Sequence, residues 1–187
     1  MKKLLTILLA LALEFAFCAC GTSPINSTVN NTETTGNWEA QLTGGTAQAS
    51  LLNFVVAFTV TNSGPLLISG MGFYNQSSCF GNGINLQSAA GTASFTTNNA
   101  GQVVGTLDLT VTSNTTGSVL TLTGQLTGTS NGTTTTVGTL SNGVVVGTWK
   151  LTPGPTATSC NAGSGNFVMC QGAATCSTTS SALTDRL

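Results

Sequence analysis

The 187-residue sequence contains no histidine, and only 5% of its residues carry a charge. Four lysines and arginines stand against five aspartates and glutamates, for a formal net charge of −1. These shortages exclude a histidine-based catalytic triad, a histidine-ligated metal site and a basic surface for nucleic acid. Solubility must rest on Ser, Thr, Asn, Gln and Gly, which suits an exported protein better than a cytosolic one. The length favours one domain with a hydrophobic core.

Groups for acid–base catalysis are also scarce. Beyond the first 20 residues the carboxylates are Glu33, Glu39, Asp108 and Asp185, and the one tyrosine is Tyr74. Glu39 and Asp108 alternate with apolar residues, so we expect both on solvent-facing positions of strands. No nucleophile elbow, phosphate-binding loop or dinucleotide-binding glycine motif is present. We expect no enzymatic activity, no cofactor and no metal; the alternative is a glycosidase-like pair of Glu39 and Asp108 across a cleft.

The N-terminus has the pattern of an export signal. Met1-Lys2-Lys3 precedes an apolar run from Leu4 to Leu13, which is too short to span a bilayer. Phe17-Cys18-Ala19-Cys20-Gly21 follows and resembles the bacterial lipobox. The resemblance implies removal of residues 1–19 as a signal peptide and attachment of acyl chains, palmitate among them, to Cys20. The alternative is an ordinary cleaved secretory signal.

Acylated Cys20 would make membrane lipid the first partner of the chain. Stable anchoring takes more than one acyl chain, which a lipoprotein carries. Residues 20–35 are polar and aperiodic, which predicts a flexible tether. No aspartate follows Cys20 at positions 21 and 22, and this favours the outer over the inner membrane of the bacterial envelope.

Residues 36–170 show the period-two alternation of β-strands with one buried face. The inward positions are Leu52, Phe54, Val56, Phe58, Val60, Val103, Leu107, Leu109, Val111, Leu120, Leu122, Leu126, Val145, Trp149 and Leu151. Asn99-Ala100-Gly101, Asn131-Gly132 and Asn142-Gly143 have the composition of hairpin turns. We therefore expect an all-β, antiparallel up-and-down meander of about eight to ten strands. Residues 171–187 form a Ser/Thr-rich tail.

Glycines recur on the inward face of these strands. Gly36, Gly105, Gly124 and Gly147 each stand two residues before a bulky side chain. Glycine there weakens a strand unless the sheet bends sharply, as in a barrel. A closed barrel also protects the edges of a sheet that has few charges. We therefore expect a closed or nearly closed β-barrel; the alternatives are a two-sheet sandwich and a membrane-spanning barrel.

Gly36-Asn37-Trp38 and Gly147-Thr148-Trp149 resemble the Gly-x-Trp signature of lipocalins and avidins. The resemblance implies a calycin-like barrel and does not identify a ligand. Two functions remain open. In one, Trp38, Phe54, Phe58, Phe95 and Trp149 line a cavity for a small apolar ligand; in the other, they fill the core and the Thr/Asn-rich outer face contacts envelope polymer or a partner. A cavity of roughly 300 Å³ or more inside the barrel favours the first, and a filled interior the second.

The cysteines after the anchor predict two disulfide bonds. Cys79, Cys160, Cys170 and Cys176 are an even number in an exported chain, and four cysteines allow three connectivities. We favour Cys79 with Cys160 and Cys170 with Cys176. The alternative is a four-cysteine zinc site, against which stands the lack of any Cys-x-x-Cys pair.

Overall fold

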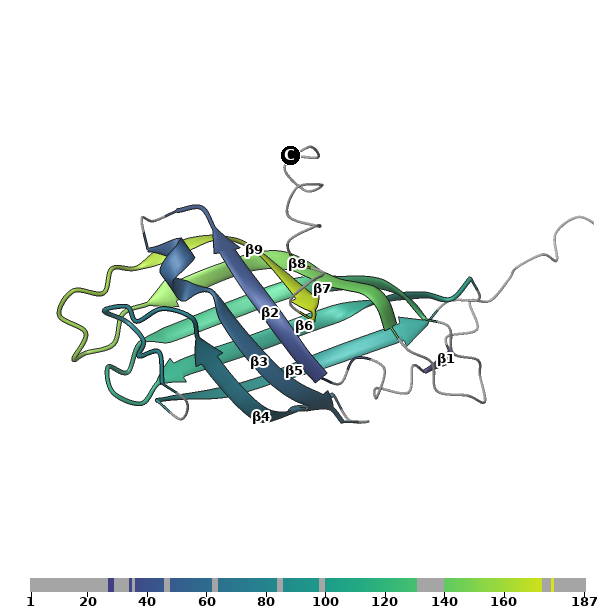
Figure 1. Ribbon diagram of the computed structural model, residues 1–187, viewed down its shortest axis with the longest axis horizontal. Helices are drawn as coiled ribbons and strands as arrows, with labels where there is room; N and C mark the ends of the chain where they lie inside the picture. The colour runs from purple at the N-terminus through teal and green to yellow at the C-terminus, as the bar shows by residue number, and fades with distance from the viewer. Residues whose placement is uncertain are drawn as a thin grey trace, which may run out of the picture.

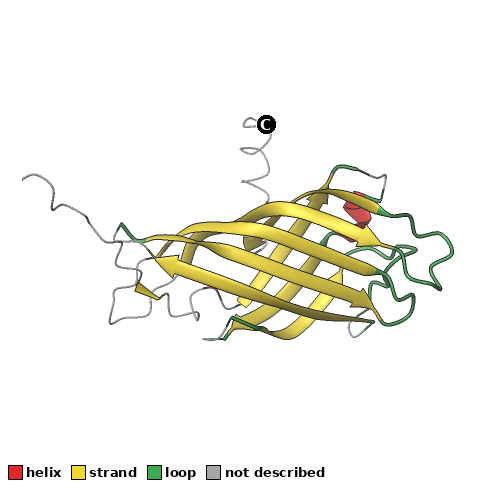
Figure 2. Cartoon of the chain, turned by 180° about the vertical axis from the view of Figure 1, so that it is seen from behind, coloured by secondary structure: helices red, strands yellow, loops and turns green. Residues whose placement is uncertain are grey.

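The computed structural model describes residues 27–28, 34, 36–45, 48–61, 64–83, 86–97, 100–130, 140–172 and 176. Within these residues, strands β2 to β9 form a nearly closed antiparallel barrel (Figures 1 and 2). The predicted all-β meander is confirmed, and the sandwich alternative is wrong. The signal peptide, Cys20, the Asn131-Gly132 turn and residues 177–187 lie outside the described residues.

The strands run in an up-and-down order around the barrel. Their bounds are Gly36–Thr43 (β2), Phe54–Val60 (β3), Leu66–Phe73 (β4), Gln87–Thr97 (β5), Gln102–Ser113 (β6), Val119–Ser130 (β7), Leu140–Thr152 (β8) and Gly163–Gln171 (β9). A two-residue strand, Ser27–Thr28 (β1), pairs with the end of β5, and a 3₁₀ turn, Ala49–Leu52 (η3), precedes β3. The order in the sheet is β1-β5-β6-β7-β8-β9-β2-β3-β4.

The barrel is closed by a full ladder between β9 and β2, whereas a single bridge links β5 to the residue before β4. β9 pairs with β2 from Trp38 opposite Gln171 to Thr43 opposite Asn166. Pro65, just before β4, forms a single bridge with Thr92 of β5, next to a hydrogen bond of 2.7 Å from the Ala93 amide to the Gly64 carbonyl. Within the described residues β4 itself has no ladder with β5, so the barrel is nearly closed there.

The alternation that the sequence shows determines what is buried. All the inward positions named above are at most 3% exposed and form one core inside the barrel. Leu52 is part of this core but lies in η3, because β3 begins only at Phe54. The core residues come from every long strand, so each strand depends on its neighbours for burial of its apolar face.

The inward glycines allow the strands to coil around this core. A side chain on Gly147 would place its Cβ 2.0 Å from the Thr123 carbonyl oxygen, and one on Gly105 would place it 2.4 Å from the Phe95 ring. Neither position has room for a methyl group. Gly105, Gly124 and Gly147 are thus required by close packing inside the barrel, as the sequence predicts. Gly36 is different: its added Cβ would meet only the Gln171 side chain, at 3.9 Å, and its φ of 134° is what favours glycine there.

The prediction of a hairpin turn at Asn142-Gly143 is wrong. Both residues lie inside β8, where Asn142 has a φ of 54° and the β7–β8 register shifts by one residue. The extra residue makes a β-bulge. Asparagine and glycine are favoured in a bulge for the same reason as in a tight turn, since both tolerate a positive φ. Asn142-Gly143 therefore correctly indicates a residue with a positive φ, but such a residue occurs both in tight turns and in β-bulges.

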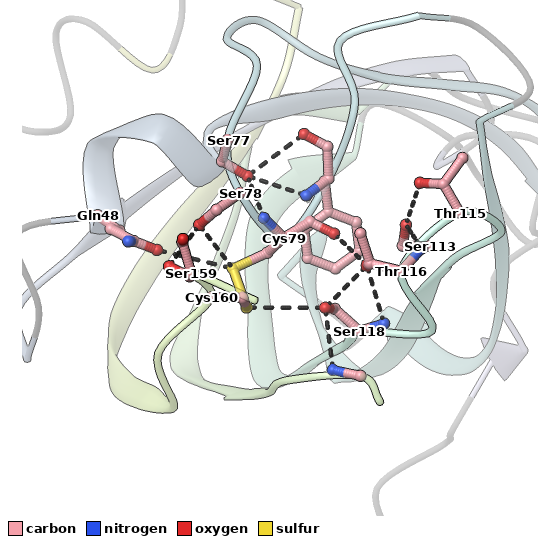
Figure 3. The surroundings of a disulfide bond; sticks show 12 residues. Gln48, Ser77, Ser78, Cys79, Ser113, Thr115, Thr116, Ser118, Ser159 and Cys160 are labelled. Carbon is pink, nitrogen blue, oxygen red and sulfur yellow. Dashed lines mark hydrogen bonds between the residues drawn. A yellow bond between two sulfur atoms is a disulfide. The ribbon is translucent and has the colours of Figure 1, made fainter. Parts of the chain in front are cut away.

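A disulfide bond joins the loops at one end of the barrel (Figure 3). Cys79 follows β4 and bonds to Cys160, which lies just before β9. Thr116, between β6 and β7, donates its hydroxyl hydrogen bond to the Cys79 carbonyl at 2.7 Å. Ser78 donates to the Ser159 carbonyl at 2.8 Å. This bond and Cys170–Cys176 are the two pairs that the sequence favours, and both are present.

Candidate functional site

The five aromatic residues predicted to face the interior all lie there. Trp38, Phe54, Phe58, Phe95 and Trp149 are between 0% and 4% exposed. Trp38 stacks on Phe58, with ring centroids 5.8 Å apart and planes 10° apart. These rings belong to the same continuous cluster as the aliphatic core residues. The side chains that could have lined a ligand cavity therefore pack against one another.

The polar atoms of the two tryptophans are already paired inside the protein. The Trp38 Nε1 donates to the Thr34 carbonyl at 2.9 Å, and the Trp149 Nε1 donates to the Thr43 carbonyl at 3.1 Å. A buried indole normally finds such a partner, and here the partner is backbone. Neither nitrogen needs a ligand to satisfy it, so both tryptophans have the features of core residues.

The outer face of β7, β8 and β9 carries a polar hollow. It has a volume of about 440 Å³ and is lined by Thr121, Thr123, Thr148, Trp149, Lys150, Ser164, Gly165 and Asn166. The register explains the composition, because Thr121 lies opposite Lys150 and Lys150 opposite Ser164. Within the described part of the chain, Lys150 is the only lysine or arginine. The hollow thus combines hydroxyl groups, an amide and one ammonium group.

The carboxylates Glu39 and Asp108 do not form a pair. Glu39 is on β2 and Asp108 on β6, and strands β7, β8 and β9 lie between them in the sheet. Asp108 instead accepts a hydrogen bond of 2.8 Å from the Thr123 hydroxyl. The arrangement that a two-carboxylate glycosidase needs is therefore not formed by these two residues.

A second hollow lies on the outer face of β2, β3 and β4. Its volume is about 460 Å³, and its lining is mainly apolar. Two cross-strand rows form its floor, Glu39–Val55–Gly72 and Asn37–Ala57–Gly70, with Gly172 at its side. We call it the outer groove. Sequence analysis missed it; the only signal was Gly70-Met71-Gly72, two glycines on the outward face of a strand.

The two outward glycines are not needed for packing. A Cβ added at Gly70 or Gly72 would meet nothing within 4 Å, in contrast to the inward Gly105, Gly124 and Gly147. Neither residue has a positive φ. Glycine inside a strand costs stability, and neither position needs glycine to avoid a clash, although Gly70 borders the register shift between β3 and β4. This contrast identifies the outer groove as a candidate binding surface.

Polar side chains border the outer groove at Glu39. Its carboxylate accepts a hydrogen bond of 3.1 Å from Gln41. Burial raises the pKa of the nearby Tyr74 phenol above its usual 10.0, and the Glu39 carboxylate raises it further. The phenol therefore stays protonated over the physiological range. Among the described residues, no cation neutralises this carboxylate.

In the described ranges, no group of three cysteine, aspartate or glutamate side chains is placed to hold a metal ion. No helix in that part of the chain has the length and apolar character needed to cross a bilayer. Comparison of the chain with protein-family models, with curated proteins and with solved structures gives no significant match.

Proposed function

We propose that this chain is a lipid-anchored protein of the bacterial envelope that acts by surface contact and not by catalysis. The anchor is Cys20, in the outer membrane, and the partner is an envelope polymer that carries hydroxyl and carboxylate groups. The likeness to lipocalins and avidins extends, in this proposal, to the architecture and not to an internal ligand.

The observation that carries the proposal is the contrast between the inside and the outside of the barrel. The interior aromatic side chains are packed against one another and their polar atoms are satisfied. The outer face has a hollow in which Thr121, Thr123 and Thr148 surround Lys150. Hydroxyl groups and an ammonium group can bind the hydroxyls and carboxylates of a glycan–peptide polymer.

Binding to the polymer is tested with the mature protein in detergent and purified peptidoglycan. We expect co-sedimentation that falls at least about tenfold when Thr148→Val and Lys150→Gln are combined, because a charge-assisted contact and a hydroxyl contact are both lost. Thr59→Val is the matched control, since Thr59 is an exposed threonine on β3, away from the hollow. Equal sedimentation of all three proteins would contradict the proposed surface.

The anchor needs a separate test. Cells given a fatty-acid analogue should label the wild-type protein and not Cys20→Ala, and the label should fractionate with the outer membrane. An unlabelled wild type would overturn the anchoring. Native mass spectrometry of the purified protein checks the alternative function, because a small apolar molecule carried in the barrel would appear as added mass.

A further inference from the structure

Cys176, which lies beyond the end of β9, covers part of the outside of the barrel. Cys176 is fully buried, although it lies beyond the last strand. It packs with Cys170, its disulfide partner, and with Val144, Val146 and Val168, which are outward-facing residues of β8 and β9. An apolar patch on the outer face is thus shielded by Cys176.

The outer groove begins where this cover ends. The Cys176 Sγ lies 3.4 Å from the carbonyl oxygen of Glu39, and Glu39 lines the groove. Cys170 and Glu39 are opposite each other in the β2–β9 ladder, so the disulfide stands at the border between the two surfaces. A chain that continues from Cys176 starts at the rim of the groove.

The remaining chain has the length and the side chains to occupy the groove. About 11 residues follow Cys176, and fully extended they would reach up to about 36 Å. They include Leu183 and Leu187, which suit the apolar floor of Val55, Ala57 and glycine backbone. They also include one cation, Arg186, directly after Asp185, and Glu39 has no cationic partner among the described residues.

We propose that residues 177–187 fold back and bind in the outer groove, with leucine side chains in the hollow and Arg186 beside Glu39. The disulfide bond to Cys170 holds the start of the segment at the rim, which gives the rest a high effective concentration. The segment extends the cover that Cys176 begins, from β8 and β9 across β2 to β3 and β4. This function of the tail is separate from anchoring and from polymer binding.

Photo-crosslinking tests the contact in the full mature protein. With Thr184 replaced by p-benzoylphenylalanine, both leucines and Arg186 stay in place. We expect crosslinks within one molecule to peptides that contain Asn37–Glu39, Val55–Ala57 or Gly70–Gly72. The crosslink yield should fall at least about tenfold in Gly72→Leu, because the added side chain fills the hollow that a buried leucine would occupy.

The control is Thr59→Leu, which adds the same side chain to an exposed position of the neighbouring strand β3. It should leave the yield unchanged. Glu39→Gln, or high salt, should reduce the yield by about two- to fivefold, as expected for an exposed ion pair. Crosslinks scattered over other surfaces, crosslinks found only between two molecules, or a yield that Gly72→Leu does not change would each overturn the proposal.

Discussion

Gly124 on β7 and Gly147 on β8 lie directly opposite each other; Gly124 makes room for the ring of Phe167 on β9, and Gly147 makes room for the backbone of β7. A Cβ on Gly124 would lie 2.8 Å from the Phe167 Cζ, and one on Gly147 would lie 2.5 Å from the Gly124 Cα. The two missing side chains therefore allow the adjacent strands to curve closely around an aromatic residue of the core.

Gly147→Ala should destabilise the barrel by about 1 to 3 kcal/mol or more, because the methyl group meets backbone that cannot move without displacing β7. Gly72→Ala is the matched control. It is also a glycine in the middle of a strand, but its added methyl group meets nothing within 4 Å. We expect that change to be neutral or to stabilise by up to about 1 kcal/mol. Urea unfolding measures both, and equal losses would contradict the distinction.

The two disulfide bonds should contribute unequally to stability. Cys79 and Cys160 are separated by 81 positions in the sequence, whereas Cys170 and Cys176 are separated by 6, so the first bond closes a much longer loop. Replacing both cysteines of the long bridge by alanine should cost about 4 kcal/mol, and replacing those of the short bridge about 2 kcal/mol. The comparison is made by chemical denaturation of the two double variants. A larger loss from the short bridge would mean that packing of Cys176 outweighs loop entropy.

The ionisation of the Tyr74 phenol can be measured by itself, because Tyr74 is the only tyrosine in the chain. Its pKa reports on Glu39, which lines the outer groove. Its pKa is raised above 10.0, so the stability that its protonated form contributes is complete below pH 10.0 and is lost as the pH rises through the folded-state pKa. Ultraviolet absorbance of the phenolate should give a midpoint above 10.0 in the wild type. Glu39→Gln should lower that midpoint, and Tyr74→Phe should remove both the signal and this alkaline component of unfolding. An unchanged midpoint in Glu39→Gln would contradict the contact.

Phe58 should behave as a core residue. Phe58→Ala should reduce the free energy of unfolding by about 3 to 5 kcal/mol, because it removes a buried ring that stacks on Trp38 and leaves a cavity. Leu67→Ala on β4 is the control, since Leu67 is 61% exposed and its truncation should change stability by less than about 0.5 kcal/mol. Thermal or urea unfolding measures the pair. A small loss at Phe58 would indicate a loosely filled interior and would favour the ligand-binding alternative.

The strand pattern could be predicted from the sequence because burial in a sheet follows a period of two, which is a local property. Leu107, Leu122 and Trp149 are inward for that reason alone. The inward glycines indicated a coiled sheet, and the number and position of the cysteines favoured the two pairs that are formed. Asn142 shows the limit of such reasoning, since its tolerance of a positive φ serves a bulge as well as a turn.

The surfaces were decided only by tertiary structure. Val55, Ala57, Gly70 and Gly72 are far apart along the chain from Asn37 and Glu39, and they form one groove because the pairing register sets them side by side. The same register places Lys150 between Thr121 and Ser164. The alternation within a strand determines which face is buried, but the residue that each position faces on the neighbouring strand also depends on the turns and on closure of the barrel around its core.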